Sequence, residues 1–328
     1  MLSWTKQRGP IGLDIGTHSI KAAALDAGGE LVAFAQVPRE SSGPLGLPEA
    51  SRLVRVLDQR GLVGDRVIVA TPRDMLMTAV LELPPRSSGA PVEQIAADEL
   101  AKLHSTTSSD LTMHLRDLPK PVRGGESLQA IALGVRTDAA HELLRVLGEA
   151  GLDPMRIETS GSALLRGAEL DKPAVPSGAA RVVVDAGWSS TAIVVATRDG
   201  VVSERHIGVG LATIAERAGR DETDRAARRA MSDLAGPTHM ARTSGAALID
   251  AFTSELDRVL SFSQSLYGIE RLDSLMLAGG GAALLAGALT QDDRVARFNP
   301  ELSPHPALLT AIGLAAGAMR SGARGAAA

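Results

Sequence analysis

Three short apolar runs follow one another near the start of the chain. Ile11–Ile15, Ser19–Leu25 and Leu31–Val37 have the length and apolar content of β-strands. Residues Asp26–Gly29 supply the chemistry of a turn between the last two runs. The pattern therefore predicts three consecutive strands, and a linker rich in Pro, Gly and Ser follows them at Ser41–Pro48.

A second set of three runs repeats this arrangement in the other half of the chain. Arg181–Ala186, Ser190–Thr197 and Val201–Ile207 are again predicted to be strands. The pair Asp199-Gly200, between the last two, is typical of a tight hairpin. Two similar three-strand units in one chain indicate an internal duplication.

Strand and helix patterns alternate over the remaining segments, which is typical of an α/β protein. The best domain boundary is Asp171–Ala180, because it contains two prolines and a glycine within a polar stretch. The expected helices cover residues 49–60, 91–103, 139–151, a segment from 160, 212–235, 245–267 and the Ala- and Gly-rich C-terminus, and the further expected strands cover 66–71, 75–83, 128–135, 154–158 and 272–278.

Length and composition limit the possible classes of protein. The chain has 328 residues, above the roughly 250–300 at which one hydrophobic core stops growing, so at least two domains are expected. Its net charge is −4 and it has no basic block, which argues against a nucleic-acid partner or a polybasic membrane patch. The absence of cysteine excludes disulfides, thiolate zinc sites, iron–sulfur clusters and a cysteine nucleophile.

No segment has the pattern of a membrane anchor or a signal peptide. The longest apolar stretches, Leu275–Leu289 and Ala307–Met319, are shorter than the ~20 residues that a spanning helix needs. The two positive charges near the start have no apolar run behind them. The sequence therefore predicts a cytoplasmic protein without direct membrane insertion.

The candidate chemistry lies where the first strand of each unit turns into the second. Asp14 and Asp185 each stand at the end of an apolar strand, Gly16 and Gly187 follow two positions later, and hydroxyl side chains come next. Glycine allows a tight turn and a close backbone approach, so N–H groups and hydroxyls can donate to phosphoryl oxygens. The Asp carboxylates are placed to hold Mg²⁺, directly or through water. A single such hairpin is usually only a turn, whereas two copies favour a nucleotide clamp.

A glycine triplet supplies a third candidate loop. Gly279, Gly280 and Gly281 come after a predicted strand and before a predicted helix. One interpretation is a simple strand-end turn. The other is that their amides face a nucleotide at the helix N-terminus.

These motifs resemble those of the actin, Hsp70 and sugar-kinase superfamily. Within it, the chain is most similar to the type IV pilus assembly PilM family, which is related to the division protein FtsA. The similarity extends over nearly the whole chain and includes IGLDIGTHSIKAAAL, AGLDPMRIE, VVVDAGWSSTAIVV, LMLAGGG and AIGLAAGAM. It implies an actin-like fold of the ribonuclease H-like duplicated βββαβα type, a two-domain nucleotide clamp with a small α+β domain inserted in the first half.

The resemblance also implies domain limits and binding residues. Domain 1A would comprise residues 1–72, completed by 151–178 and the C-terminal helix 307–328, with a 1C-like insertion at 73–150 and the second actin-like domain (2A/2B) at 179–306. ATP and Mg²⁺ would bind in the central cleft. By carry-over, phosphate loop one is Asp14, Gly16, Thr17, Ser19 and Lys21, phosphate loop two is Asp185, Gly187, Ser189, Ser190 and Thr191, Gly279–Gly281 cover the adenosine side, and Asp14 and Asp185 hold the metal.

Three further residues carry open alternatives. Glu158, at a strand-to-helix junction, is either the group that positions the attacking water or a strand-end or helix-cap acid. Trp188 either crowds the terminal phosphate or is a buried or capping aromatic. His18 is expected to point to solvent or to pack locally rather than to catalyse.

The family resemblance implies a scaffold for pilus assembly. Such a protein would bind ATP with at most slow hydrolysis, stay at the inner face of the inner membrane, and grip the short cytoplasmic tail of a bitopic PilN-like protein. Whether it self-associates is left open. The alternatives are an enzyme of the same fold that hydrolyses ATP or transfers a phosphoryl group, and a degenerate secretion-system module that binds no nucleotide.

Overall fold

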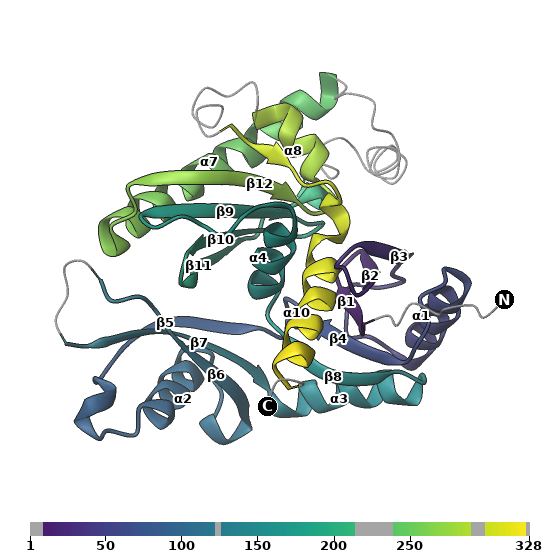
Figure 1. Cartoon of the computed structure of the whole chain (residues 1–328), viewed down its shortest axis with the longest axis horizontal. Helices are drawn as coiled ribbons and strands as arrows, with labels where there is room; N and C mark the ends of the chain where they lie inside the picture. Colours follow the sequence, from purple (N-terminus) through teal and green to yellow (C-terminus); the bar gives the residue numbers. More distant parts are fainter. Residues whose placement is uncertain (1–8, 122–125, 214–238, 290–298, 326–328) are drawn as a thin grey trace.

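The computed structural model describes residues 9–121, 126–213, 239–289 and 299–325. Its centre is formed by two five-stranded sheets with matching topology (Figure 1). The first has the order β3-β2-β1-β4-β8 and the second the order β11-β10-β9-β12-β13. The strands are β1 (Ile11–Ile15), β2 (Ser19–Leu25), β3 (Leu31–Pro38), β4 (Arg66–Ala70), β8 (Asp153–Glu158), β9 (Ala179–Ala186), β10 (Thr191–Thr197), β11 (Gly200–Ile207), β12 (Arg271–Ala278) and β13 (Glu301–Leu302).

Strand directions are the same in both sheets. The three consecutive strands of each unit pair antiparallel, and the next two strands join in parallel. The hairpin predicted at Asp199-Gly200 is present, with Thr197 paired to Gly200 and Gly200 at φ +114°. The predicted duplication and the α/β fold class are confirmed.

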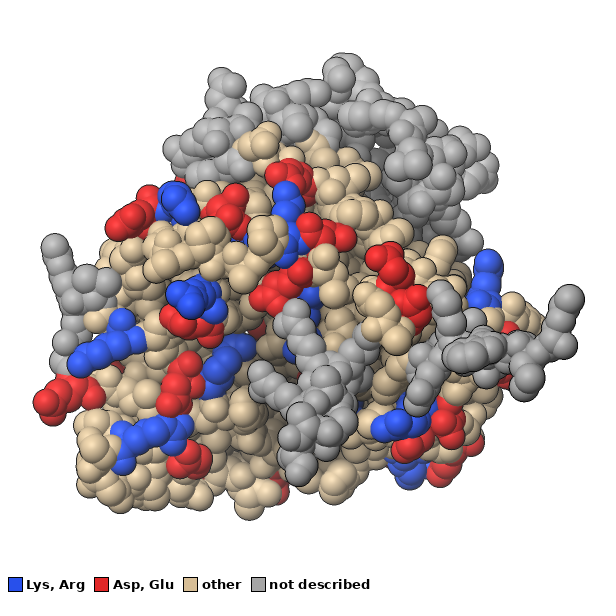
Figure 2. All heavy atoms as spheres, in the orientation of Figure 1, with Lys and Arg blue, Asp and Glu red and all other residues tan. Residues whose placement is uncertain are grey.

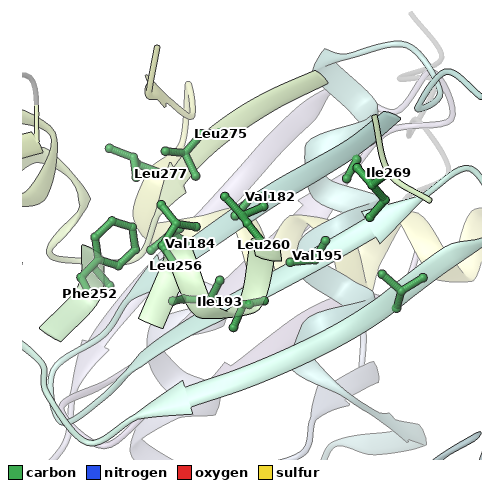
Figure 3. Packing of buried hydrophobic residues seen from close by; sticks show 14 of the residues in the cluster. Val182, Val184, Ile193, Val195, Phe252, Leu256, Leu260, Ile269, Leu275 and Leu277 are labelled. Atoms are coloured by element: carbon green, nitrogen blue, oxygen red, sulfur yellow. The ribbon is translucent and has the colours of Figure 1, made fainter. Parts of the chain in front are cut away.

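Helices pack on both faces of each sheet and bury most of it, although alternate residues of the edge strand β3 are exposed. The first sheet packs between α1 (Leu47–Gln59) and α3 (Thr137–Glu149) on one face and α10 (Leu309–Gly325) on the other. The second packs between α7 (His239–Tyr267) and α4 (Ser160–Asp171). Figure 3 shows aliphatic side chains of β9, β10 and β12 meeting Phe252 and Leu256 of α7. The core is accordingly almost entirely aliphatic.

Helices α4 and α10 lie between the two sheets and contact each other closely (Figure 1). Their approach depends on glycine. A Cβ at Gly313 would overlap the carbonyl oxygen of Ala163, and one at Gly167 would lie 2.6 Å from the carbonyl oxygen of Leu309. The small residues of the C-terminal segment therefore allow the backbone of α10 to pack directly against the backbone of α4.

A small antiparallel sheet forms a separate layer beside the two large ones. Its order is β5-β7-β6, and α2 (Val92–Leu103) covers one face. The strands are β5 (Met77–Leu83), β6 (Leu111–Asp117) and β7 (Leu128–Arg136). Leu76, Ile131 and Leu133 on its other side join the core of the second large sheet.

Some elements differ from the sequence-based expectation. β6 and the two-residue β13 were not predicted, and α7 starts at His239 instead of Gly245. Most of the helix expected over 212–235 lies outside the described residues. The remaining described elements are α8 (Ala282–Leu289) and short 3-10 turns at Arg86–Ser88, Ser108–Asp110 and Pro306–Leu308. Among the described helices, none combines the length and apolar character needed to cross a membrane.

Candidate functional site

The two predicted phosphate hairpins have the same local geometry. The Gly16 N–H donates to the carbonyl oxygen of Ser19 at 3.2 Å, and the Gly187 N–H donates to that of Ser190 at 3.0 Å. A Cβ at Gly187 would lie 2.8 Å from the Ser190 oxygen, so the turn requires glycine there. Each hairpin joins the first two strands of its sheet.

The tips of the hairpins touch each other across the cleft between the halves. The Thr17 and Ser189 hydroxyls are 3.1 Å apart. The rings of His18 and Trp188 are stacked, with centroids 4.2 Å apart and planes inclined by 19°. His18 therefore packs across the cleft, and not locally or toward solvent as expected, and Trp188 acts as a capping aromatic against the opposite loop.

Charged groups of both hairpins face one cavity. Lys21 Nζ donates to Asp14 Oδ2 at 3.2 Å, and their side chains are only 16% and 19% exposed. Burial, followed by the charge of Asp14, raises the pKa of Asp185 from 3.8 to about 6, although Lys21 and His206 oppose this. Burial lowers the pKa of Lys21, but Asp14 and Asp185 together outweigh it and hold that pKa above its ordinary value.

The glycine triplet closes over the second hairpin. Gly281 N–H donates to the Ala186 carbonyl oxygen at 2.9 Å. Gly279 has φ +89°, and a Cβ there would overlap Asp185 Oδ1 and the Ala186 carbonyl oxygen. The backbone of this loop at Gly279 therefore packs against the carboxylate of Asp185 and limits its positions.

These loops enclose a cavity of about 110 Å³. The structure brings most of the sequence-predicted binding residues to its wall, namely Asp14, Gly16, Thr17, Ser19, Lys21, Asp185, Gly187, Ser189, Ser190 and Gly280. Thr191, Gly279 and Gly281 are not among the lining residues. The Thr191 hydroxyl is buried and donates to the Val209 carbonyl oxygen at 2.9 Å, so its hydrogen bond supports the loop.

Glu158 does not line this cavity. Its carboxylate forms ion pairs with Arg156 and Arg166, and Arg166 also donates to the Gly313 carbonyl oxygen at 3.0 Å. The sequence-based role of positioning an attacking water is therefore not supported by its place in the fold. The environment matches the alternative, an acid at the end of a strand that ties β8 to α4 and α10.

Sequence reasoning missed several polar residues of the cavity wall, and two of them, Arg39 and His206, have defined partners next to the cavity. Arg39, just after β3, donates to the Gly16 carbonyl oxygen at 3.3 Å and pairs with Glu49 of α1 at 3.2 Å. His206 of β11 also lines the cavity, and its Nε2 is 3.1 Å from Glu204 Oε1. Neither residue is part of a local motif; the alternation of VVSERHI, which puts Glu204 and His206 on one face, was the only available signal.

A second, larger hollow of about 740 Å³ lies between the small sheet and the first half. Its wall includes Thr112, His114 and Arg116 of β6. Helix α3 contributes Leu144, β8 contributes Arg156 and Glu158, and α4 contributes Arg166. On the face seen in Figure 2, Lys and Arg side chains are interspersed with Asp and Glu among the described residues.

The donor set of the smaller cavity fits a hydrated divalent cation bound with phosphates. Asp14 and Asp185 raise each other's electrostatic energy there, which is one reason why the pKa of Asp185 is raised. A cation between them relieves that repulsion, and two carboxylates suit Mg²⁺, which keeps several waters and takes its other ligands from phosphates. The described residues contain no cluster of three or more acidic, His or Cys side chains placed as a metal site, so phosphate oxygens would have to complete the shell.

Comparison with solved structures identifies the fold. The chain has the actin-like ATPase fold. A chain described as part of a PilM-PilN type IV pilus biogenesis complex is 19% identical, with a TM-score of 0.68, and the match covers 95% of this chain and 98% of that one. The ethanolamine utilization protein EutJ of Carboxydothermus hydrogenoformans is 17% identical, with a TM-score of 0.57 over 94% and 89% of the two chains.

A third solved structure is a nucleotide complex. The activator of 2-hydroxyisocaproyl-CoA dehydratase from Clostridium difficile, with bound ADPNP, is 13% identical, with a TM-score of 0.51 over 97% of both chains. No family model matches the chain, and no curated protein sequence does. The similarity is therefore one of fold.

Proposed function

We propose that this protein is a PilM-like, ATP-binding scaffold of a type IV pilus or related assembly machine. The observation that carries the proposal is the pair of equivalent phosphate hairpins that face one cavity from two duplicated halves. The full-length match to a chain of a PilM-PilN complex favours a pilus role over an unrelated ATPase.

Mg-ATP would be held between the halves. Asp14 and Asp185 take the cation, and Lys21 offers a charge-assisted contact to a phosphate oxygen. Thr17, Ser189 and Ser190 supply hydroxyl donors around the same cavity. Gly279–Gly281 shape the adenosine side. When bound, Mg²⁺ neutralises phosphate charge.

We further propose slow or no turnover. Among the predicted groups, only Glu158 was a candidate to position water, and its carboxylate is committed to two arginines. A turnover of about 1–10³ s⁻¹, the range of ordinary enzymes, would argue instead for the phosphoryl-transfer alternative.

The partner is proposed to be the short cytoplasmic tail of a PilN-like membrane protein, bound in the 740 Å³ hollow. That hollow lies where the inserted segment, residues 73–150, meets the first half, whose proposed limits are 1–72, 151–178 and 307–328. β6 is an edge strand of the small sheet, so an extended peptide could add to it. This arrangement would hold the protein at the cytoplasmic face of the inner membrane through its partner.

Thermal unfolding tests the nucleotide part of the proposal. At a ligand concentration 100-fold above Kd, binding stabilises the folded state by about 2.7 kcal/mol. For a chain of this size this corresponds to a rise in Tm of roughly 5–10 °C. Asp14→Ala should remove most of the rise, measured as the Tm with Mg-ATP minus the Tm without it in the same variant, because loss of the ion pair with Lys21 also lowers the Tm without nucleotide. No rise up to millimolar Mg-ATP would mean that the clamp is vestigial.

Calorimetric titration with a synthetic PilN-like tail tests the partner part. Leu144→Asp places a charge in the wall of the hollow and should abolish binding of the peptide. Leu103→Asp is the matched control, because Leu103 is 62% exposed on α2, which covers the other face of the small sheet. If both variants lost affinity for the peptide equally, or if neither lost any, the assignment of the hollow would be contradicted.

A further inference from the structure

The registers of the two large sheets place equivalent residues in two matching rows. In the first sheet, Asp14 pairs with Lys21 and Lys21 pairs with Gln36. In the second sheet, Asp185 pairs with Ala192 and Ala192 pairs with His206. Paired residues of adjacent strands project to the same face of a sheet. His206 therefore shares a face with Asp185, on the side that lines the phosphate-hairpin cavity.

The two rows differ in which strand supplies the basic side chain. In the first half it is Lys21, on the middle strand. In the second half the middle position is Ala192, which fills little space, and the next residue outward is His206. Because adjacent strands lie roughly 4.8 Å apart, an imidazole on the third strand can reach over an alanine toward the aspartate row. Asp185 and His206 are close enough to affect each other electrostatically.

His206 is held by a buried carboxylate. Nε2 of its ring is 3.1 Å from Glu204 Oε1, and the two side chains are 10% and 3% exposed. An ionised carboxylate can only accept, so the ring carries a hydrogen on Nε2. Nδ1 has no hydrogen-bond partner among the described residues. The dyad thus fixes the orientation of the imidazole and leaves its second nitrogen for another group.

Glu204 is itself set in a specific place. Its Oε2 lies against Gly161 in the first turn of α4, where any Cβ would overlap the carboxylate. The positive end of that helix dipole favours a carboxylate. Arg116 of β6 also faces Glu204 closely enough to interact electrostatically. A His–Glu pair at the surface would not require the contact with Gly161, the dipole of α4 or the nearby charge of Arg116.

We propose that His206 is a phosphate-contacting residue of the nucleotide site, the second half's counterpart of Lys21, and that Glu204 is its positioning residue. This inference rests on the proposed ATP-binding function. The ligand class is a phosphoryl group held with Mg²⁺ between the aspartates. The contact comes from the third strand of the unit, outside both phosphate hairpins.

Calorimetric titrations with Mg-ATP and with adenosine test this proposal. His206→Asn keeps a group that can bond Glu204 but removes the second ring nitrogen. It should weaken Mg-ATP binding by about tenfold or more, as expected for a lost hydrogen bond to a charged group, and leave adenosine affinity within twofold. His104→Asn, an exposed histidine after α2, is the matched control and should bind both ligands as wild type does.

A double-mutant cycle tests the positioning role of Glu204. Glu204→Gln should weaken Mg-ATP binding in the wild-type background and have no further effect in the His206→Asn background. Mg-ATP affinity within twofold of wild type in His206→Asn, or an equal loss for adenosine, would overturn the inference alone. A wild-type protein that binds no Mg-ATP would overturn the proposed nucleotide function as well, so the two failures are distinguishable.

Discussion

The shape of the second hairpin, proposed to bind phosphate, depends directly on Gly279. At φ +89° a side chain is strained by about 1–3 kcal/mol, and here a Cβ would also overlap Asp185 Oδ1 and the Ala186 carbonyl oxygen. We expect Gly279→Ala to lower the free energy of unfolding by more than Gly61→Ala. The control position has φ +72° but meets nothing within 4 Å of an added Cβ. Urea denaturation of both variants compares them; equal losses would contradict the overlap argument.

Asp185 should give the apo protein a distinct pH dependence. The ordinary pKa of an aspartate, 3.8, applies to the unfolded chain, and in the folded protein the pKa of Asp185 is about 6. The folded state therefore binds the proton more tightly. The resulting stability, roughly 3 kcal/mol for about two pH units, is present below pH ~4 and lost as pH rises through ~6. With EDTA and without nucleotide, Asp185→Asn should therefore be more stable than wild type at pH 7.5 and lose that advantage near pH 4. A difference that does not change with pH would contradict the raised pKa.

Glu158 should matter for stability and not for nucleotide binding. Glu158→Gln removes the charge that pairs with Arg156 and Arg166, and loss of one partner of a mostly buried pair costs about 3–5 kcal/mol at most. Glu142→Gln on α3 removes an exposed pair with Arg145, which solvent screens, so its effect on stability should be small. Thermal unfolding with and without Mg-ATP separates the two effects. An unchanged Tm without nucleotide together with a lost nucleotide shift would instead place Glu158 at the nucleotide site.

At the scale of elements, the contact between α4 and α10 depends on glycines that admit backbone to backbone. Gly313→Ala would place a methyl on the Ala163 carbonyl oxygen, and overpacking of this kind costs about 1–3 kcal/mol or more. Gly148 is an exposed position of α3, and a Cβ added there meets nothing within 4 Å. Gly148→Ala should therefore stabilise the protein by about 0.5–1 kcal/mol. Denaturant unfolding should show a lower free energy of unfolding for Gly313→Ala and a higher one for Gly148→Ala. A change of the same sign in both variants would mean that α10 is not held by this contact.

The elements that the sequence predicts well are those with continuous apolar runs. Both three-strand units were predicted, as were β4 and β12, and most of these strands are unbroken apolar runs because both of their faces are buried. β6 was missed because its pattern, LTMHLRD, leaves every position half-buried or exposed. β13 has only two residues and depends on pairing with β12. The domain limits at 72/73, 150/151 and 178/179 stay predictions.

The site was predictable where its residues are neighbours in the chain. Asp14 through Lys21 form one hairpin, so local motif reasoning places them together. His206 joins the cavity only through the register of β11 on β10, and no local pattern encodes that register. The fate of Glu158 likewise depends on Arg166, which the helix α4 brings from eight residues away. What sequence reasoning missed is therefore contact between elements.

At the scale of the whole molecule, the two halves are closed upon each other. The phosphate-hairpin cavity holds about 110 Å³, below the roughly 300–1,000 Å³ of pockets that bind small molecules. The Thr17–Ser189 contact and the His18–Trp188 stack join the hairpin tips over it. Under the proposed function, ATP enters only if the halves separate. Helices α10 and α4, which contact both sheets, are the elements about which they would turn.

This closure predicts that removing the stack favours nucleotide binding. An aromatic pair contributes about 0.5–1.5 kcal/mol beyond its buried area, and that energy stabilises the closed state against opening. Because affinity for a ligand falls with the fraction of binding-competent molecules, Trp188→Ala should raise Mg-ATP affinity and association rate by about two- to tenfold. Stopped-flow binding with a fluorescent ATP analogue measures both. Phe34→Ala, an exposed aromatic on β3, is the control and should bind as wild type does. Weaker or slower binding in Trp188→Ala would instead identify the indole as part of the nucleotide site.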